Sequence, residues 1–275
     1  MNSKKTVKDI IGTVLLYTAL IIIAIVCSGP FIWLLASSFK GAEDIYTLSI
    51  IPKEFSLQNY REVFSLLSVG TMLWNSVIIT VGGILIDIVF SSLCAYPLAK
   101  IDFYGKKLVS TSLIATMIIP AAAGLVVNYL TISRLQLMDN FLGVILPNSV
   151  AVFSIILLRQ SYMAIPGEII ESARIDGAKE LKIWRIIMLP QIMPSIATIV
   201  IMDFIGKWNT FLWPLIVLDV DKYPVATGLK YLSGQFNYKF GNVAAGTVFA
   251  VIPIIIVFIA FQKYYINTMA GAIKG

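Results

Sequence analysis

Long apolar stretches alternate with short polar ones along the whole chain. The apolar blocks are residues 10–39, 71–99, 108–132, 141–158, 192–218 and 243–264. A helix needs about 20 mostly apolar residues to cross a bilayer. The pattern therefore predicts an all-α integral membrane protein, with six transmembrane helices in a single domain that covers residues 1–275.

A charged segment, residues 166–190, separates the fourth and fifth blocks. Glu171 lies near its start, where the dipole of a helix favours negative charge. Gly177 supplies a turn that accepts a positive φ. We expect two short amphipathic helices, the second running from about Ala178 until Pro190 ends it and starts the next span. An ordinary interfacial amphipathic hairpin is the alternative interpretation.

Six crossings place both termini on one side of the membrane. More of the 21 Lys and Arg residues fall on that side than on the other. The basic residues on the side of the termini are Lys4, Lys5, Lys8, Lys100, Lys106, Lys107, Arg159, Arg174, Lys179, Lys182, Arg185, Lys263 and Lys274. Cytoplasmic loops are rich in basic residues, so both termini and the charged segment are predicted to be cytoplasmic.

Composition supports the membrane assignment and narrows the chemistry. The chain is 58% hydrophobic and only 13% charged, so its net charge of +6 indicates cytoplasmic loops and not nucleic-acid binding. Cys27 and Cys94 lie inside apolar blocks and are expected to be small buried hydrophobes. The sequence has no His and no GxxxxGK[ST] motif. We therefore expect no metal site, no bound cofactor and no ATP-binding loop of that type in this chain.

The charged segment carries a spaced motif. Glu171-Ser172-Ala173 is followed after three residues by Gly177, then after nine by Ile187, and then by Leu189-Pro190. This resembles the EAA motif of the permease subunits of bacterial ABC importers; the one departure is Ser172, where the family prefers alanine. The resemblance implies a coupling loop that docks into a cytoplasmic ATPase subunit. The implied coupling residues are Glu171, Ser172, Ala173, Asp176, Gly177, Ile187, Leu189 and Pro190, with Glu171 and Gly177 as the key ones.

The resemblance extends over nearly the whole chain and is closest to the carbohydrate permeases of the maltose-transporter type, the MalG-like subunits. The similar stretches include FSLQNY at 55–60, WNTFLWPL at 208–215 and AGAIKG at 270–275. It implies a type I ABC importer permease in the bacterial cell membrane. The implied partners are a second homologous permease, two ATPase subunits that hold ATP and Mg²⁺, and an extracellular binding protein. That protein would deliver a sugar to the surfaces formed by residues 40–69 and 219–242.

Polar and aromatic residues inside the predicted spans are candidates for the substrate pathway, because polar groups are costly there. The candidates are Asp87, Asp203, Lys207, Trp208, Asn209 and Trp213. The tryptophans are suited to stacking on sugar faces and Asn209 to bonding hydroxyls. Packing or an interfacial belt is the alternative for the tryptophans, and a helix–helix hydrogen bond is the alternative for Asp87.

Asp203 and Lys207 are four residues apart, which leaves two interpretations open. They can pair along one helix face. Alternatively, Lys207 faces the pathway and attracts an acidic sugar such as a uronic or sialic acid.

Other function classes compete with a sugar importer. A related ABC permease for a polyamine or phosphate is one alternative, against which the WNTFLWPL stretch argues. A secondary transporter or channel that works alone is another, although few acidic residues in the spans and the lack of His argue against proton coupling. A membrane enzyme is disfavoured, because no Ser/His, metal-ligand or paired-carboxylate pattern occurs.

Overall fold

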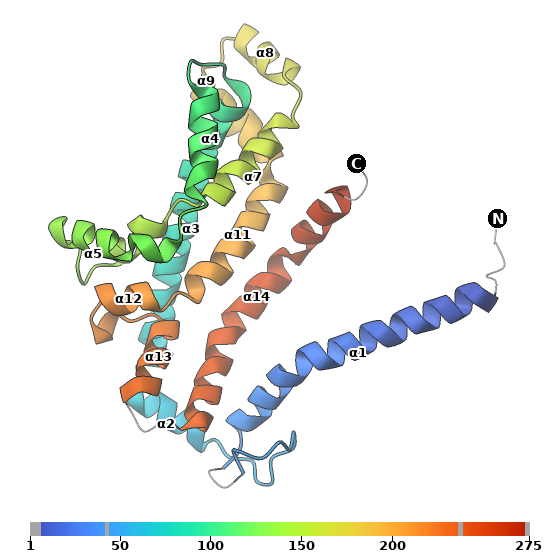
Figure 1. Cartoon of the computed structure of the whole chain (residues 1–275), viewed down its shortest axis with the longest axis vertical. Coiled ribbons are helices and arrows are strands. Elements are labelled where there is room, and N and C mark those ends of the chain that lie inside the picture. Colours follow the sequence, from blue (N-terminus) through green and yellow to red (C-terminus); the bar gives the residue numbers. More distant parts are fainter. Residues whose placement is uncertain (1–6, 42–43, 236–238, 273–275) are drawn as a thin grey trace. The chain divides into compact units, whose positions relative to one another are not determined.

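The computed structural model describes residues 7–41, 44–235 and 239–272. Lys4, Lys5 and Lys274 of the predicted cytoplasmic tails, and the end of the AGAIKG stretch, lie outside the described residues. The regular secondary structure of the described part is helical, with one isolated β-bridge between Lys40 and Phe55. The chain forms two compact units (Figure 1). The first unit is Met1–Ser68 with Leu232–Phe249, and the second is Val69–Tyr231 with Ala250–Gly275.

Three described helical stretches are long and apolar enough to cross a membrane: Ile11–Ser38, Val69–Lys100 and Phe240–Gln262. Two bent pairs also qualify if each pair is taken as one span. Phe141–Asn148 and Val152–Met163 meet at 53°, and Glu180–Gln191 and Met193–Trp208 meet at 77°. The described residues therefore hold three to five candidate spans, against the six that the apolar blocks predict.

The block 108–132 is the predicted span that is absent from the candidate spans of the described residues. Helix α4 (Lys106–Thr116) ends before Pro120, which has an extended conformation, and the chain resumes as the 3₁₀ helix Ala121–Gly124 and helix α5 (Leu125–Arg134). A proline has no N–H to donate and disfavours helical geometry in the residue before it. The break at Pro120 is the physical reason why this block forms no single continuous helix.

Three helices, α3 (Val69–Lys100), α7 (Val152–Met163) and α11 (Met193–Trp208), pack together in the second unit. Besides α4, α5 and the 3₁₀ helix between them, several shorter elements belong to this unit. They are α6 (Phe141–Ile145), the 3₁₀ turn Leu146–Asn148, α8 (Glu168–Ile175), α9 (Glu180–Lys182), the π-helical stretch Ile183–Met188, α10 (Leu189–Gln191), α12 (Leu212–Val217) and the 3₁₀ turn Val220–Lys222. Within this unit, α8 lies at one end and α12 lies far from it along the long helices (Figure 1).

The first unit contains the whole of α1 (Val7–Ser38) and of α2 (Gln58–Leu66). Two further helices contribute to both units: α13 (Val225–Gln235) and α14 (Phe240–Ala272). Gly241, at the start of α14, packs so closely on Ile45 and Asn59 that a Cβ there would lie 2.3 Å from Ile45 Cδ1. Glycine is therefore required at this position for the first turn of α14 to approach the segment after α1.

Candidate functional site

The predicted turn at Gly177 is confirmed. Helix α8 ends at Ile175, and Gly177 has a φ of +77°. The Gly177 N–H donates to the Arg174 carbonyl at 3.0 Å, and the Ala178 N–H donates to the Ala173 carbonyl at 2.9 Å. This pair of bonds is the Schellman arrangement, which closes a helix on a residue of left-handed conformation. The glycine of the motif is thus required by the backbone of the loop.

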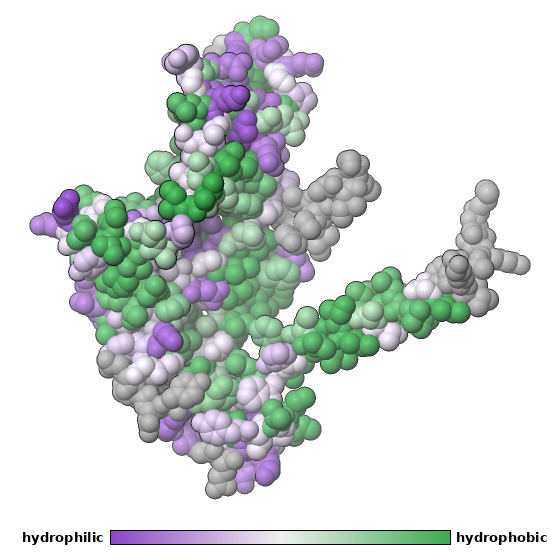
Figure 2. Space-filling view, viewed as in Figure 1, coloured by the Kyte–Doolittle hydropathy of each residue, from purple (hydrophilic) through white to green (hydrophobic). Residues whose placement is uncertain are grey.

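The coupling loop, residues 166–190, has one face packed on the long helices of its own unit and one face exposed. Its buried residues Ile170, Ala173, Ile183 and Met188 share a core with α3, α7 and α11. By contrast, Glu171, Ser172, Asp176 and Gly177 are exposed. Figure 2 shows hydrophilic side chains gathered at this end of the unit and apolar ones along the helices beyond it. The loop is attached on one side, and its exposed face with Glu171, Ser172, Asp176 and Gly177, here called the EAA face, is open.

The second arm of the loop differs from the prediction at both ends. It begins at Glu180 and not at Ala178. Pro190 does not end it, because Pro190 lies in the first turn of α10, where its missing N–H is tolerated. The chain instead bends at Ile192, between α10 and α11; helix α11 begins at Met193 and has Pro194 in its first turn. A π-helical stretch, Ile183–Met188, precedes the proline and changes the hydrogen-bond register ahead of it.

Tyr96 and Glu180 join the coupling loop to α3, and the sequence did not single them out. The Tyr96 hydroxyl donates to Glu180 Oε2 at 2.6 Å. The other oxygen of Glu180 accepts from Arg174 Nε at 2.7 Å. This ion pair raises the pKa of Arg174. Glu180 therefore connects both arms of the loop to a span, through contacts between residues far apart in sequence.

A second polar contact joins the loop to the same helix. Trp184 Nε1 donates to Ser92 Oγ at 2.9 Å, and Ser92 Oγ lies 2.6 Å from the Tyr162 hydroxyl of α7. Ser92 and Tyr162 are fully buried. The loop, α3 and α7 are thus hydrogen-bonded at a point where apolar packing also holds them.

Asp87, a pathway candidate, is fully buried in α3 and caps another helix. Its Oδ1 accepts from the Ala151 N–H at 2.9 Å and from Ser91 Oγ at 2.6 Å, and its Oδ2 accepts from Ser154 Oγ at 2.6 Å. Helix α7 has no cap from its own preceding side chain. The structure thus shows the helix–helix hydrogen bond that the sequence left as the alternative for Asp87.

Asp203 and Lys207 form an ion pair along α11, with Lys207 Nζ 3.2 Å from Asp203 Oδ2. Lys207 Nζ also donates to the Asn148 carbonyl at 3.2 Å. Gly83 of α3 gives the lysine its room, because a Cβ there would lie 2.8 Å from Lys207 Cδ. Asp203 also interacts with Asp87. Of the two interpretations of Lys207, the structure shows the paired one.

The two tryptophans are packed into the protein. Trp208 is 2% exposed, donates from Nε1 to the Ala250 carbonyl at 2.9 Å, and stacks on Phe204 with ring centroids 5.1 Å apart. Trp213 is buried and donates to the Gly143 carbonyl at 3.2 Å. Packing, the alternative given from sequence, is what the structure shows. Asn209 is exposed, and its Nδ2 donates to the Ile205 carbonyl in its own helix at 2.7 Å.

A cavity of about 70 Å³ lies beside these residues. Its lining residues are Ile79, Gly83, Val144, Ile145, Asn148, Lys207, Thr210 and Trp213. Lys207 and Trp213 therefore line the same small cavity, most of whose other lining residues are apolar.

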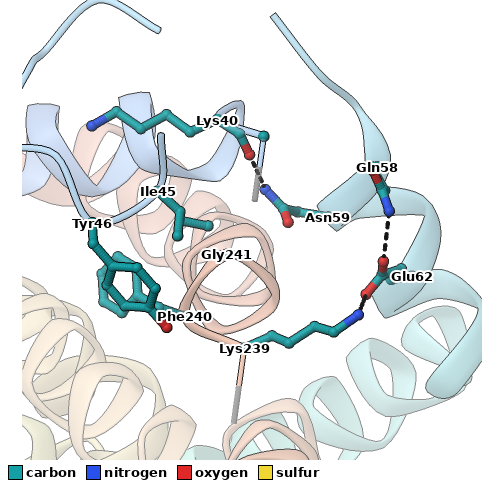
Figure 3. A pocket seen from close by; sticks show the side chains of 10 residues that line it. Lys40, Ile45, Tyr46, Gln58, Asn59, Glu62, Lys239, Phe240 and Gly241 are labelled. Carbon is teal, nitrogen blue, oxygen red and sulfur yellow. Dashed lines mark hydrogen bonds and ion pairs between the residues drawn. The ribbon is translucent and has the colours of Figure 1, made fainter. Parts of the chain in front are cut away.

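The first unit holds a larger pocket of about 210 Å³ (Figure 3). Its lining residues are Lys40, Gly41, Ile45, Tyr46, Gln58, Asn59, Glu62, Lys239, Phe240 and Gly241. Lys239, Asn242 and Gln58 all donate to Glu62, and these bonds hold the pKa of Glu62 below its ordinary value. The sequence prediction assigned this part of the chain to the outer surface and named Gln58 and Asn59 within the FSLQNY stretch, but it gave none of these side chains a role in a site.

Comparison with known proteins gives the family. Residues 87–270 match the family described as "Binding-protein-dependent transport system inner membrane component". The arabinooligosaccharides transport permease AraQ of Bacillus subtilis (strain 168) is 32% identical over 253 residues, which cover 90% of each chain. The polygalacturonan/rhamnogalacturonan transport permease YtcP of the same strain is 30% identical, over 98% of this chain and 100% of that one.

A solved structure shows the same fold at high similarity. It is a bacterial ABC transporter involved in the import of the acidic polysaccharide alginate, and one of its chains aligns with a TM-score of 0.84. That chain is 27% identical, and the alignment covers 96% of this chain and 100% of that one. The family that the EAA motif indicated is confirmed. The chain is a multi-pass permease of the bacterial membrane and belongs to the family of inner membrane components of binding-protein-dependent transport systems.

Proposed function

We propose that this chain is one of two permease subunits of an ATP-driven importer that takes up an oligosaccharide. The names of the relatives support an oligosaccharide as the substrate class. They include arabinooligosaccharides, polygalacturonan and, in a 34% identical B. subtilis permease, melibiose, raffinose and stachyose. A second alginate transporter structure, which supports the fold alone at 20% identity, is described as bound to a periplasmic protein carrying an alginate pentasaccharide. An extracellular sugar-binding protein is the corresponding partner here.

The proposed topology has six crossings and both termini in the cytoplasm. In this topology the three long helices are three crossings, and each of the two bent pairs would be one more. The sixth is the broken stretch of α4 and α5, in which the ends freed at Pro120 would be covered by the second permease. This arrangement is supported by the basic residues of the predicted inner loops.

The proposed mechanism assigns the ATP chemistry to partner subunits. Two ATPase subunits would hold ATP and Mg²⁺ and grip the coupling loops of this chain and of a homologous second permease. The single observation that carries the proposal is the loop itself: its EAA face is open while its opposite face is packed on α3 and α7. Closure of the ATPase subunits would push the loop and switch the spans between outward and inward access as a rigid-body motion.

The charge of the cargo is a separate question. Lys207 is already neutralised by Asp203, and Asp87 adds a second carboxylate nearby. This cluster gives no excess positive charge to attract an acidic sugar. The relatives include both acidic polymers and arabinooligosaccharides, so we propose the oligosaccharide class without a preference for uronic acids.

Uptake by the assembled transporter tests the substrate class. The chain would be reconstituted in proteoliposomes with its second permease, ATPase and binding protein. Labelled arabinan, galacturonan and melibiose-type oligomers would then be compared with spermidine and phosphate. We expect ATP-dependent uptake of at least one oligosaccharide and of neither non-sugar solute. Uptake of only a non-sugar solute would overturn the sugar assignment and support the alternative ABC permease.

A further inference from the structure

Glu180 lies at the junction of three elements in the second unit. Both of its carboxylate oxygens are engaged, one by Arg174 of α8 and one by Tyr96 of α3. Glu180 itself opens α9, on the far side of the Gly177 turn. The residue therefore holds together the two arms of the coupling loop and the cytoplasmic end of a long span.

Tyr96 presents a fixed partner to this carboxylate. Its side chain is 4% exposed, and its ring packs edge-on against Tyr162 of α7 at 5.7 Å between centroids. A hydrogen bond from a hydroxyl to a charged carboxylate at 2.6 Å belongs to the stronger class of hydrogen bonds. A loop joined in this way to a packed ring cannot slide along α3 without breaking the bond.

The contact of Trp184 with Ser92 supplies a second attachment on the same face of α3. Ser92 and Tyr96 are four residues apart, so they lie on successive turns of the helix, about 6 Å apart along its axis. Two attachments on successive turns oppose both sliding and pivoting of the loop. The polar positions of α3 then continue through Ser91 to Asp87, which caps the start of α7.

From this geometry we propose that Tyr96 and Glu180 are positioning residues for coupling. They fix the loop to α3, so that a displacement of the loop by the ATPase becomes a displacement of the span. Their role differs from that of Glu171, which faces outward from the loop. The inference rests on the proposed function, because it needs an ATPase that moves the loop.

The contacts argue against a purely stabilising role. The ion pair between Arg174 and Glu180 is nearly half exposed on both sides, and such pairs contribute little to folding stability. The buried apolar residues of the loop already attach it to the core. Loss of the Tyr96 hydroxyl should therefore leave the loop in place on average and remove the bond that fixes its register.

The test uses the full transporter in proteoliposomes, with Tyr96→Phe and Glu180→Gln in this chain. The readout is the number of sugar molecules taken up per ATP hydrolysed, with ATPase copurification measured in parallel. For Tyr96→Phe we expect copurification as in the wild type and sugar per ATP lower by about fivefold or more, the low end of usual coupling energies. Glu180→Gln keeps an acceptor for Tyr96 and loses the charge. Its ratio of sugar to ATP should therefore lie between those of the wild type and Tyr96→Phe.

Asp102→Asn is the matched control, because it removes the exposed Lys106–Asp102 ion pair near the end of the same helix. This control should keep the wild-type ratio. A Tyr96→Phe transporter with the wild-type ratio would overturn the inference, whether or not its melting temperature changes. If the wild-type complex transports sugar without ATP, the proposed function fails. If wild-type uptake needs ATP and Tyr96→Phe keeps the wild-type ratio of sugar to ATP, the proposed function stands and this inference alone fails.

Discussion

Asp87 of α3 accepts a hydrogen bond from the backbone N–H of Ala151 at 2.9 Å and so caps the start of α7 from a neighbouring helix. The first N–H groups of a helix have no partner within the helix. A carboxylate near them also interacts favourably with the helix dipole. The break in the fourth predicted span, between Asn148 and Val152, is therefore stabilised from α3.

We predict that Asp87→Ala destabilises the protein more than Asp87→Asn. Alanine leaves the Ala151 N–H and the Ser91 and Ser154 hydroxyls without their acceptor, at about 1–3 kcal/mol for a buried group. Asparagine keeps one acceptor oxygen and removes the repulsion with Asp203. Thermal unfolding in detergent should rank wild type above Asn and Asn above Ala. An alanine variant as stable as the wild type would show that the cap is dispensable.

The pair of Asp203 and Lys207 gives a second prediction. Lys207→Met leaves a carboxylate in a half-buried site without its cation, which is more costly than losing both charges. The double variant Asp203→Asn/Lys207→Met should therefore unfold at a higher temperature than Lys207→Met alone. Both variants should transport acidic and neutral oligosaccharides in the wild-type proportion. A selective loss of acidic sugar uptake in Lys207→Met would instead support the hypothesis that Lys207 faces the pathway.

Two glycines of the coupling loop provide a matched comparison. Gly177 has a φ of +77°, and Gly167 has a φ of −65°; neither has a neighbour that a Cβ would contact. Gly177→Ala should therefore strain the turn by about 1–2 kcal/mol, and Gly167→Ala should not. We expect less ATPase to copurify with Gly177→Ala than with Gly167→Ala. Equal copurification would mean that the left-handed turn does not matter for docking.

The position of Trp213 depends on the close approach of Gly143. A Cβ at Gly143 would lie 2.2 Å from the Leu137 carbonyl oxygen, and the Gly143 carbonyl accepts the Trp213 N–H. Gly143→Ala should destabilise by about 1–3 kcal/mol, as overpacking does. Gly206→Ala in α11 is the control, because nothing lies within 4 Å of its Cβ position. A Gly143→Ala protein that unfolds at the same temperature as Gly206→Ala would contradict this account.

The coupling loop was predictable because its signals are local. The spacing of Glu171, Gly177 and Pro190 and the turn residue can be read along the chain, and only the ends of the second helix were misplaced. Prolines show the limit of local signals. Pro97 lies within α3, which continues to Lys100, whereas Pro120 separates α4 from α5. The surrounding packing, which sequence does not display, decides between these outcomes.

Contacts between distant segments were not predictable. Apolar periodicity identified Tyr96 and Asp87 as residues of a span, but it does not say which helix each side chain meets. Trp208 illustrates the consequence. Its position beside Asn209 suggested a sugar contact. In the structure its ring stacks on Phe204, and its Nε1 donates to the Ala250 carbonyl.

The most direct test of the central claim, that this permease couples ATP hydrolysis to sugar import through its loop, is uptake by proteoliposomes carrying Glu171→Lys. Its control is Glu168→Lys, on the same helix and equally exposed. We predict that wild-type and Glu168→Lys transporters take up sugar only with ATP, ATPase and binding protein present. Glu171→Lys should insert normally and lose at least about tenfold of this uptake, as expected for a docking contact worth 1.4 kcal/mol or more. Wild-type uptake by Glu171→Lys, or uptake by this chain alone without ATP, would contradict the account.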